Sequence, residues 1–133
     1  MSDFKIGDIS NKLEANKTVP TLQNVRVYFQ NELQRVTLAR YHADKSLCIR
    51  LEALDGEPWA TATVCMEGTN QAPVLAENQV IIKDWSENTG ILSALIAANI
   101  VHPPFASCMA GFTSASICNL TDSFARLVKK EGI

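Results

Sequence analysis

The sequence lacks the long apolar run of a membrane span, the pattern of a secretory leader and any surplus of basic residues. A membrane-spanning helix needs about 18 consecutive apolar residues, and no stretch approaches that length. The first residues show no basic start, apolar centre or small-residue cleavage site. The chain carries 12 basic and 14 acidic residues, whereas nucleic-acid binders usually cluster Lys and Arg. We therefore expect a cytoplasmic protein that binds neither membranes nor nucleic acid directly.

Residues that support catalysis or metal binding are also few. The four cysteines show no C-x-x-C spacing, and neither phosphate-binding glycine motifs nor H-E-x-x-H or G-x-S-x-G are present. We expect buried thiols, no metal and no cofactor. A Cys-dependent enzyme is the least favoured hypothesis; it would use Cys108 or Cys118, with His102 as a possible base for Cys108 across the Pro-Pro turn.

The length favours a single domain. A chain of 133 residues forms one hydrophobic core and leaves no room for a second domain of ordinary size. Residues 1 to 20 have no clear period and end at Pro20, so we predict an N-terminal arm there. Residues 21 to 133 are predicted to form one α+β domain, in which an antiparallel sheet of five to six strands packs with two helices.

Alternating apolar residues between positions 25 and 66 predict an N-terminal antiparallel meander. Asp55-Gly56 lies between two alternating runs, 46–54 and 58–66, and predicts a hairpin with positive φ at both turn positions. The preceding run, 35–41, pairs consistently with the first of them. The expected cross-strand pairs are Val36 with Leu51, Leu38 with Ile49 and Arg35 with Glu52. The predicted outer face carries Arg26, Tyr28, Thr37, Arg50 and Trp59.

The second half of the chain predicts two more strands and two helices. The strands are expected at 78–84 and 111–120. A central helix is expected from Glu87 to Asn99, capped by Ser86 and ending before Pro103. A C-terminal helix is expected with Thr121 or Asp122 as its cap and Gly132 after its end.

Acidic residues are concentrated in one part of the chain. Residues 51 to 92 hold seven acids and one base. One interpretation is a solvated face; the other is an acidic surface that binds a basic partner protein. The predicted partner-binding residues are Asp55, Glu57, Trp59, Asp84, Trp85 and Glu87.

Residues 88 to 121 contain no Asp, Glu, Lys or Arg, and this absence predicts burial on most sides. Either the rest of the chain covers the central helix or a second copy does, as in a homodimer. The small residues expected at an oligomer interface are Gly90, Ala94, Ala97 and Ala98. A glycine in a first helical turn costs up to about 1 kcal/mol, so we expect another backbone or a partner to pass close to Gly90.

Three motifs carry a family resemblance across residues 46 to 120. They are the DGEPWAT hairpin that starts at Asp55, the KDWSEN segment that starts at Lys83 and is followed by Ile91-Leu92, and the strand GFTSASICNL that starts at Gly111. This combination resembles an uncharacterised family of small proteins encoded by phages and other bacterial mobile elements. The chain departs from the family in its N-terminal arm, its C-terminal helix and its uncharged Ala-Ala-Asn helix end. The resemblance implies no catalytic residue.

The resemblance implies an accessory protein that binds stoichiometrically to host machinery, including anti-CRISPR-like inhibition of a defence complex. Together with the acidic segment, it favours a non-catalytic protein whose partner is a host protein with a basic surface. The alternative is an oligomeric module that binds a small molecule or nucleotide.

Overall fold

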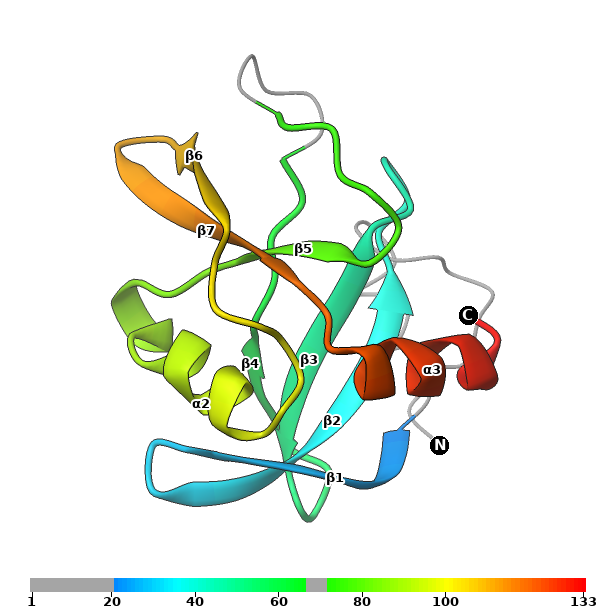
Figure 1. Cartoon of the computed structure of the whole chain (residues 1–133). Coiled ribbons are helices and arrows are strands. Elements are labelled where there is room, and N and C mark those ends of the chain that lie inside the picture. Colours follow the sequence, from blue (N-terminus) through cyan, green and yellow to red (C-terminus); the bar gives the residue numbers. More distant parts are fainter. Residues whose placement is uncertain (1–20, 67–71) are drawn as a thin grey trace.

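The structure, a computed structural model, describes residues 21 to 66 and 72 to 133. The predicted N-terminal arm lies outside these residues. The fold is α+β, with a four-stranded and a three-stranded antiparallel sheet and two α-helices, as Figure 1 shows. The predicted fold class is confirmed.

The first sheet is the predicted meander, with strand order β1-β2-β3-β4. Its strands are β1 (Thr21–Phe29), β2 (Glu32–Arg40), β3 (Leu47–Ala53) and β4 (Pro58–Thr61). All three predicted pairs between β2 and β3 are present: Arg35 opposite Glu52, Val36 opposite Leu51 and Leu38 opposite Ile49. Only Gly56 of the Asp55-Gly56 turn has a positive φ, because the connection is longer than a two-residue loop.

The predicted strand 58–66 joins the two sheets instead of staying in one. After β4, Ala62 still donates its N–H to Ile49 of β3 at 2.8 Å. The next residues pair with β5 (Gln79–Ile82), because Thr63 forms a bridge with Ile82 and Val64 donates to Ile81 at 3.0 Å. One continuous segment therefore fixes the relative position of the two sheets.

The second sheet has the order β5-β7-β6. The strands predicted at 78–84 and 111–120 are observed as β5 and β7 (Thr113–Asn119). A further strand, β6 (Ala106–Ala110), was not predicted. Its residues, ASCMA, are small and follow a Pro-Pro pair, so the sequence shows no alternation there. β6 forms a hairpin with β7 that projects from the body of the molecule (Figure 1).

The predicted central helix is interrupted. A 3-10 turn, η1 (Ser86–Asn88), precedes α2 (Ile91–Ala97), and Gly90 between them has φ +97°. That conformation is left-handed and cannot be part of a right-handed helix. Ser86 is not the cap, because its own φ is +56° and η1 has no side-chain cap. The prediction of one helix from Glu87 to Asn99 was therefore wrong at its start.

The C-terminal helix is observed as α3 (Asp122–Glu131). The hydroxyl of Thr121 accepts the N–H of Phe124 at 3.2 Å, which makes Thr121 the N-cap. Gly132 has φ +72° and ends the helix, as glycine at this position commonly does. The predicted cap and C-terminal stop are both confirmed.

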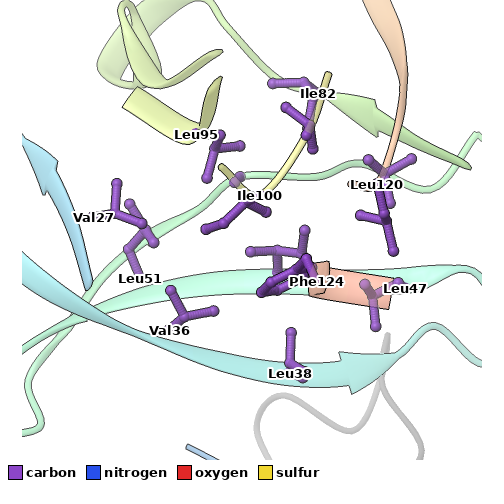
Figure 2. Close-up of a cluster of buried hydrophobic side chains, with 14 of the residues drawn as sticks. Val27, Val36, Leu38, Leu47, Leu51, Ile82, Leu95, Ile100, Leu120 and Phe124 are labelled. Atoms are coloured by element: carbon purple, nitrogen blue, oxygen red, sulfur yellow. The ribbon is translucent and has the colours of Figure 1, made fainter. Parts of the chain in front are cut away.

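One hydrophobic core joins the two sheets and the helices. Figure 2 shows Val27, Val36 and Leu51 of the first sheet facing Leu95 of α2, with Phe124 of α3 beside them. Leu95 and Ile100 are fully buried. The core confirms the inner face that the strand periodicity predicts, because Val27, Val36, Leu38, Ile49 and Leu51 are all buried.

Two expectations about burial were wrong. Thr37, predicted on the outer face, is only 1% exposed, because the far end of that face is also packed: Ala39, Tyr41 and Cys48 form a second small cluster there. The uncharged stretch 88–121 is not buried on most sides. Phe105 is 52% exposed, Met109 43% and Phe112 entirely.

Candidate functional site

The turns of the two hairpins of the first sheet lie at the same end of that sheet. Gln34 at the start of β2 pairs with Ala53 at the end of β3, so the β1–β2 turn and the β3–β4 turn follow one another across the edge (Figure 1). The exposed residues at this end are named the hairpin-tip surface. They are Tyr28, Gln30, Glu32, Leu33, Leu54, Asp55, Glu57, Trp59 and Glu87.

Large apolar side chains are exposed at this end. Tyr28 is 63% exposed and lies directly opposite Leu33, which is 48% exposed. Leu54 is 51% exposed and Trp59 is 41% exposed. Single exposed apolar residues are common, but a group with aromatic members is typical of a protein-binding surface. Among these four side chains, only Trp59 was predicted from the sequence to bind a partner.

Gln30 holds the indole of Trp59 in place. The indole Nε1–H donates to Gln30 Oε1 at 3.0 Å, and Gln30 Nε2 donates to the carbonyl of Glu87 at 2.8 Å. Gln30 and Asn31 both have positive φ, as in the tight two-residue turn that matches strand twist. The sheet curls so that this turn reaches β4 and η1. Trp59 is therefore exposed yet fixed in orientation.

The carboxylates of this surface are only partly neutralised. Asp55 accepts the N–H of Glu57 at 3.0 Å within the turn, and neither side chain forms an ion pair in the described part of the chain. Glu87 pairs with Lys83 at 2.8 Å. The hydrogen bond from Lys83 lowers the pKa of Glu87, which is therefore ionised at neutral pH. The surface carries unpaired negative charge beside Trp59.

Two of the six predicted partner-binding residues have other roles. Asp84 Oδ1 accepts the N–H of Gly90 at 2.9 Å and of Leu92 at 3.1 Å, so it caps the start of α2. Trp85 packs, partly buried, against the cluster that includes Ile81. Adjacent residues of an extended chain point to opposite faces. Asp84 and Trp85 thus have capping and packing roles, whereas Asp55, Glu57, Trp59 and Glu87 are the members of the predicted set that the structure leaves exposed.

The four predicted oligomer-interface residues lie in α2 or directly beside it: Gly90 precedes the helix, and Ala98 follows it. Gly90 and Ala97 are exposed, whereas Ala94 and Ala98 pack partly buried against the main core. A Cβ added to Gly90 would lie 3.9 Å from the Phe29 ring, an ordinary contact distance. No close backbone approach explains this glycine; its left-handed φ does.

The pKa values of three of the four thiols are shifted upward. Burial raises the pKa of Cys48 and of Cys108, and raises the pKa of Cys118 to about 11. The protonated thiol is a poor nucleophile. Cys108 lies opposite Ala115, whereas the N–H of His102 bonds to Asn119. Four residues of strand separate these positions, or about 13 Å, so the structure does not join Cys108 and His102.

A surface hollow of about 570 Å³ lies at the opposite end of β2 and β3 from the hairpin-tip surface. Its lining is mixed in charge, with Arg40 and Lys45 facing Asp44 and Glu77. Among the described residues, no group of three or more His, Cys, Asp or Glu side chains is placed to hold a metal ion. None of the described helices has the length and apolar character needed to cross a membrane. The small-molecule hypothesis stays a prediction.

Comparison of the chain with protein-family models, with curated proteins and with solved structures gave no match. The interpretation of the site therefore depends on its own geometry. That geometry places a hydrogen-bonded indole, exposed apolar side chains and unpaired carboxylates at one end of a sheet.

Proposed function

We propose that this protein is a non-catalytic binding protein, which captures a partner protein with a basic surface through the hairpin-tip surface. The observation that carries the proposal is the exposed indole of Trp59, held by Gln30 among carboxylates. Trp is the residue most enriched among the side chains that dominate protein–protein binding energy. Fixing its orientation before binding lowers the entropy lost in the complex.

The charge around Trp59 selects the partner. Glu57 and Asp55 are exposed and form no ion pair in the described residues. Opposite charge on a partner accelerates encounter and rejects partners of the same sign. A basic protein surface meets both requirements, since Arg and Lys side chains pair with the carboxylates while their neighbours pack on the indole.

The proposed biological setting follows from the family resemblance of the sequence. A phage or mobile-element accessory protein that lacks catalysis acts by occupying a host component, one protein per binding site. Host complexes that handle nucleic acids present basic surfaces for phosphate binding, and an acidic protein competes for them. Anti-CRISPR-like inhibition is one form of this proposed activity.

Affinity capture from a bacterial lysate at low and high salt tests the proposal. The wild-type protein should retain a partner at low salt and lose most of it at high salt, because salt screens charges at a surface. Trp59→Ala should weaken capture by about thirtyfold, which corresponds to about 2 kcal/mol. Glu57→Lys should also weaken capture, and its loss relative to the wild-type protein should be largest at low salt, where charges are least screened.

Glu77→Lys is the matched control for Glu57→Lys. Glu77 is also exposed, forms no ion pair in the described residues and lies at the other end of the first sheet. Both substitutions change the net charge equally. If Glu77→Lys weakened capture as much as Glu57→Lys, only the overall charge would matter, and the proposed surface would be wrong.

A further inference from the structure

The β6–β7 hairpin carries an exposed strand edge of unusual composition. In the second sheet β6 is the last strand, and among the described residues it pairs only with β7. Natural edge strands are commonly protected by Lys, by Pro or by an irregularity within the strand. The β6 sequence ASCMA contains no charge and no proline. Pro103 and Pro104 precede the strand and leave it open.

The other exposed edges of the two sheets differ from β6. The far side of β5 is covered by the connecting segment, since Thr63 and Val64 pair with Ile82 and Ile81. β1, at one edge of the first sheet, packs against α2. β4, at the other edge of the first sheet, contains Pro58, and its Thr61 carbonyl accepts the side-chain N–H of Asn88 at 2.7 Å. Within the described chain, β6 thus combines an uncovered position with an apolar, neutral sequence that lacks proline.

The hairpin geometry determines which backbone groups of β6 face outward. Ala110 and Thr113 are partners on either side of the two-residue turn Gly111-Phe112. The hydrogen bond that closes such a turn makes them a bonded pair. Bonded and non-bonded pairs alternate along an antiparallel ladder. The N–H and C=O groups of Ser107 and Met109 therefore point away from β7, toward whatever lies beyond the edge.

We propose that β6 pairs antiparallel with β6 of a second copy of this chain, so that one sheet runs through both copies. The symmetric register has its centre at Cys108. In that register Ser107 of each copy lies opposite Met109 of the other, and Ala106 lies opposite Ala110. The outward backbone groups of one copy then meet the outward groups of the other, and each set is satisfied.

Charge identifies the second copy as the occupant. The whole protein has a net charge of -2, so most of its surface repels another copy weakly. Residues 88 to 121 carry no charge, and two copies meet there without repulsion. A basic or acidic partner would find no charged group to pair with on this edge.

The exposed apolar side chains of the hairpin fit the same arrangement. Phe105 directly precedes β6, and Phe112 lies in the turn that follows it. In antiparallel pairing the start of one strand lies beside the end of the other. Phe105 of each copy therefore comes next to the Gly111-Phe112 turn of the second copy. These two exposed side chains, at 52% and full exposure, lose contact with water together.

Cross-linking through Cys108 tests the register directly. In the proposed dimer the two Cys108 residues form a non-bonded pair, with Cα atoms about 4.5 Å apart. That separation lies within the range of about 4.4 to 6.8 Å that a disulfide requires. Diamide, which takes up the two electrons and two protons released as the thiols join, should convert the protein to a covalent dimer. Cys108→Ser should abolish the cross-link and leave the non-covalent dimer intact.

Sedimentation equilibrium of the full-length protein supplies the second measurement. The wild-type protein should sediment as a dimer. Ser107→Pro removes one outward N–H that the β6–β7 ladder does not use, and should give a monomer whose far-ultraviolet circular dichroism is unchanged. Met109→Lys should also give a monomer, because it puts a charge at the edge.

Ser114→Lys is the matched control for Met109→Lys. Ser114 is the register partner of Met109 and is also exposed, but it lies one strand in from the edge. Its variant should remain a dimer. The proposal is overturned by a wild-type monomer at all accessible concentrations, by a dimer that Cys108 does not cross-link, or by a dimer that persists in Ser107→Pro. The last result would point to another interface, such as α2.

Discussion

The hairpin-tip surface and the β6–β7 hairpin both expose large apolar side chains, but they differ in charge and in anchoring. At the hairpin-tip surface, Trp59 is hydrogen-bonded to Gln30, and Gln30 to Glu87. Asp55 and Glu57, which form no ion pair in the described residues, lie four and two residues before Trp59 in the chain. The β6–β7 hairpin has no charged residue. The hairpin-tip surface suits a partner protein with a basic surface. The β6–β7 hairpin suits the uncharged β6 strand of a second copy.

Exposed apolar area therefore does not by itself identify the kind of partner that a small domain binds. Neighbouring charge decides which partner a surface tolerates. Free backbone groups decide whether a partner adds as a strand or packs by side chains alone. Four substitutions or conditions are expected to separate the two surfaces or to remove their common support.

The largest expected effect comes from the core that supports both surfaces. Leu95 of α2 is fully buried in the cluster that joins the two sheets (Figure 2). Leu95→Ala should lower the free energy of unfolding by about 3 kcal/mol, measured by urea denaturation. Partner capture and self-association should then fall together. If either persisted at temperatures where the variant is unfolded by circular dichroism, that surface would not depend on this core.

Gly90→Ala tests the junction behind the hairpin-tip surface. A left-handed φ costs a residue with a Cβ about 1 to 2 kcal/mol, so the variant should be destabilised by that amount in urea denaturation. The added methyl group has space beside Phe29, and strain alone should account for the loss. Self-association through β6 should be unchanged. A more stable variant would contradict the left-handed conformation.

Asp84→Ala should have a smaller effect at the same junction. It removes the acceptor of the Gly90 and Leu92 N–H groups, and loss of a cap costs about 1 kcal/mol. Urea denaturation measures the change. Asp84→Asn keeps an acceptor oxygen and should recover most of the stability. Equal losses in the two variants would show that the charge of Asp84, and not its hydrogen bonds, stabilises α2.

The smallest effect concerns pH at the hairpin-tip surface. Lys83 lowers the pKa of Glu87 in the folded state, so this pair stabilises the fold above the unfolded carboxyl pKa. The contribution is lost as pH falls through the folded pKa. The melting temperatures of wild-type protein and Lys83→Gln should therefore differ slightly near neutral pH and converge in acid. A difference that grew in acid would exclude this origin.

Most of the first sheet could be predicted from the sequence, because its strands and their register depend on residues close together in the chain. Strict alternation in β2 and β3 leaves one register that buries Val36, Leu38, Ile49 and Leu51 together, and the structure has that register. The N-cap of α3 at Thr121 could also be predicted from the sequence. The break at Gly90 was not predicted, since Ser86 and Glu87 have the pattern of a helix cap and a first-turn acid and put the expected start at Glu87, before the observed start at Ile91.

The candidate site was predicted only in part. Asp55, Glu57, Trp59 and Glu87 come together, but Gln30, which holds Trp59, was not recognised. Gln30 lies 29 residues from Trp59 in the chain, and a distant side-chain hydrogen bond leaves no periodic signal. Trp85 was assigned to the same surface as Trp59 because the two share a charged neighbourhood in sequence. Side chains alternate between two faces in the extended chain after β5, and Trp85 points to the face where it packs against the cluster that includes Ile81.

The α+β class, the meander and its register could all be predicted from the amino-acid sequence, because alternation and turn residues act over a few positions. Which uncharged residues are buried and which are exposed depends on the packing of the whole fold. The uncharged stretch 88–121 was expected to be buried, yet its second half forms a projecting hairpin with exposed Phe105, Met109 and Phe112. The hydrophobic effect favours burial of apolar side chains, but it is non-directional and does not specify which part of the chain or which partner buries them. The packed fold covers α2 in part and leaves β6 as an open edge.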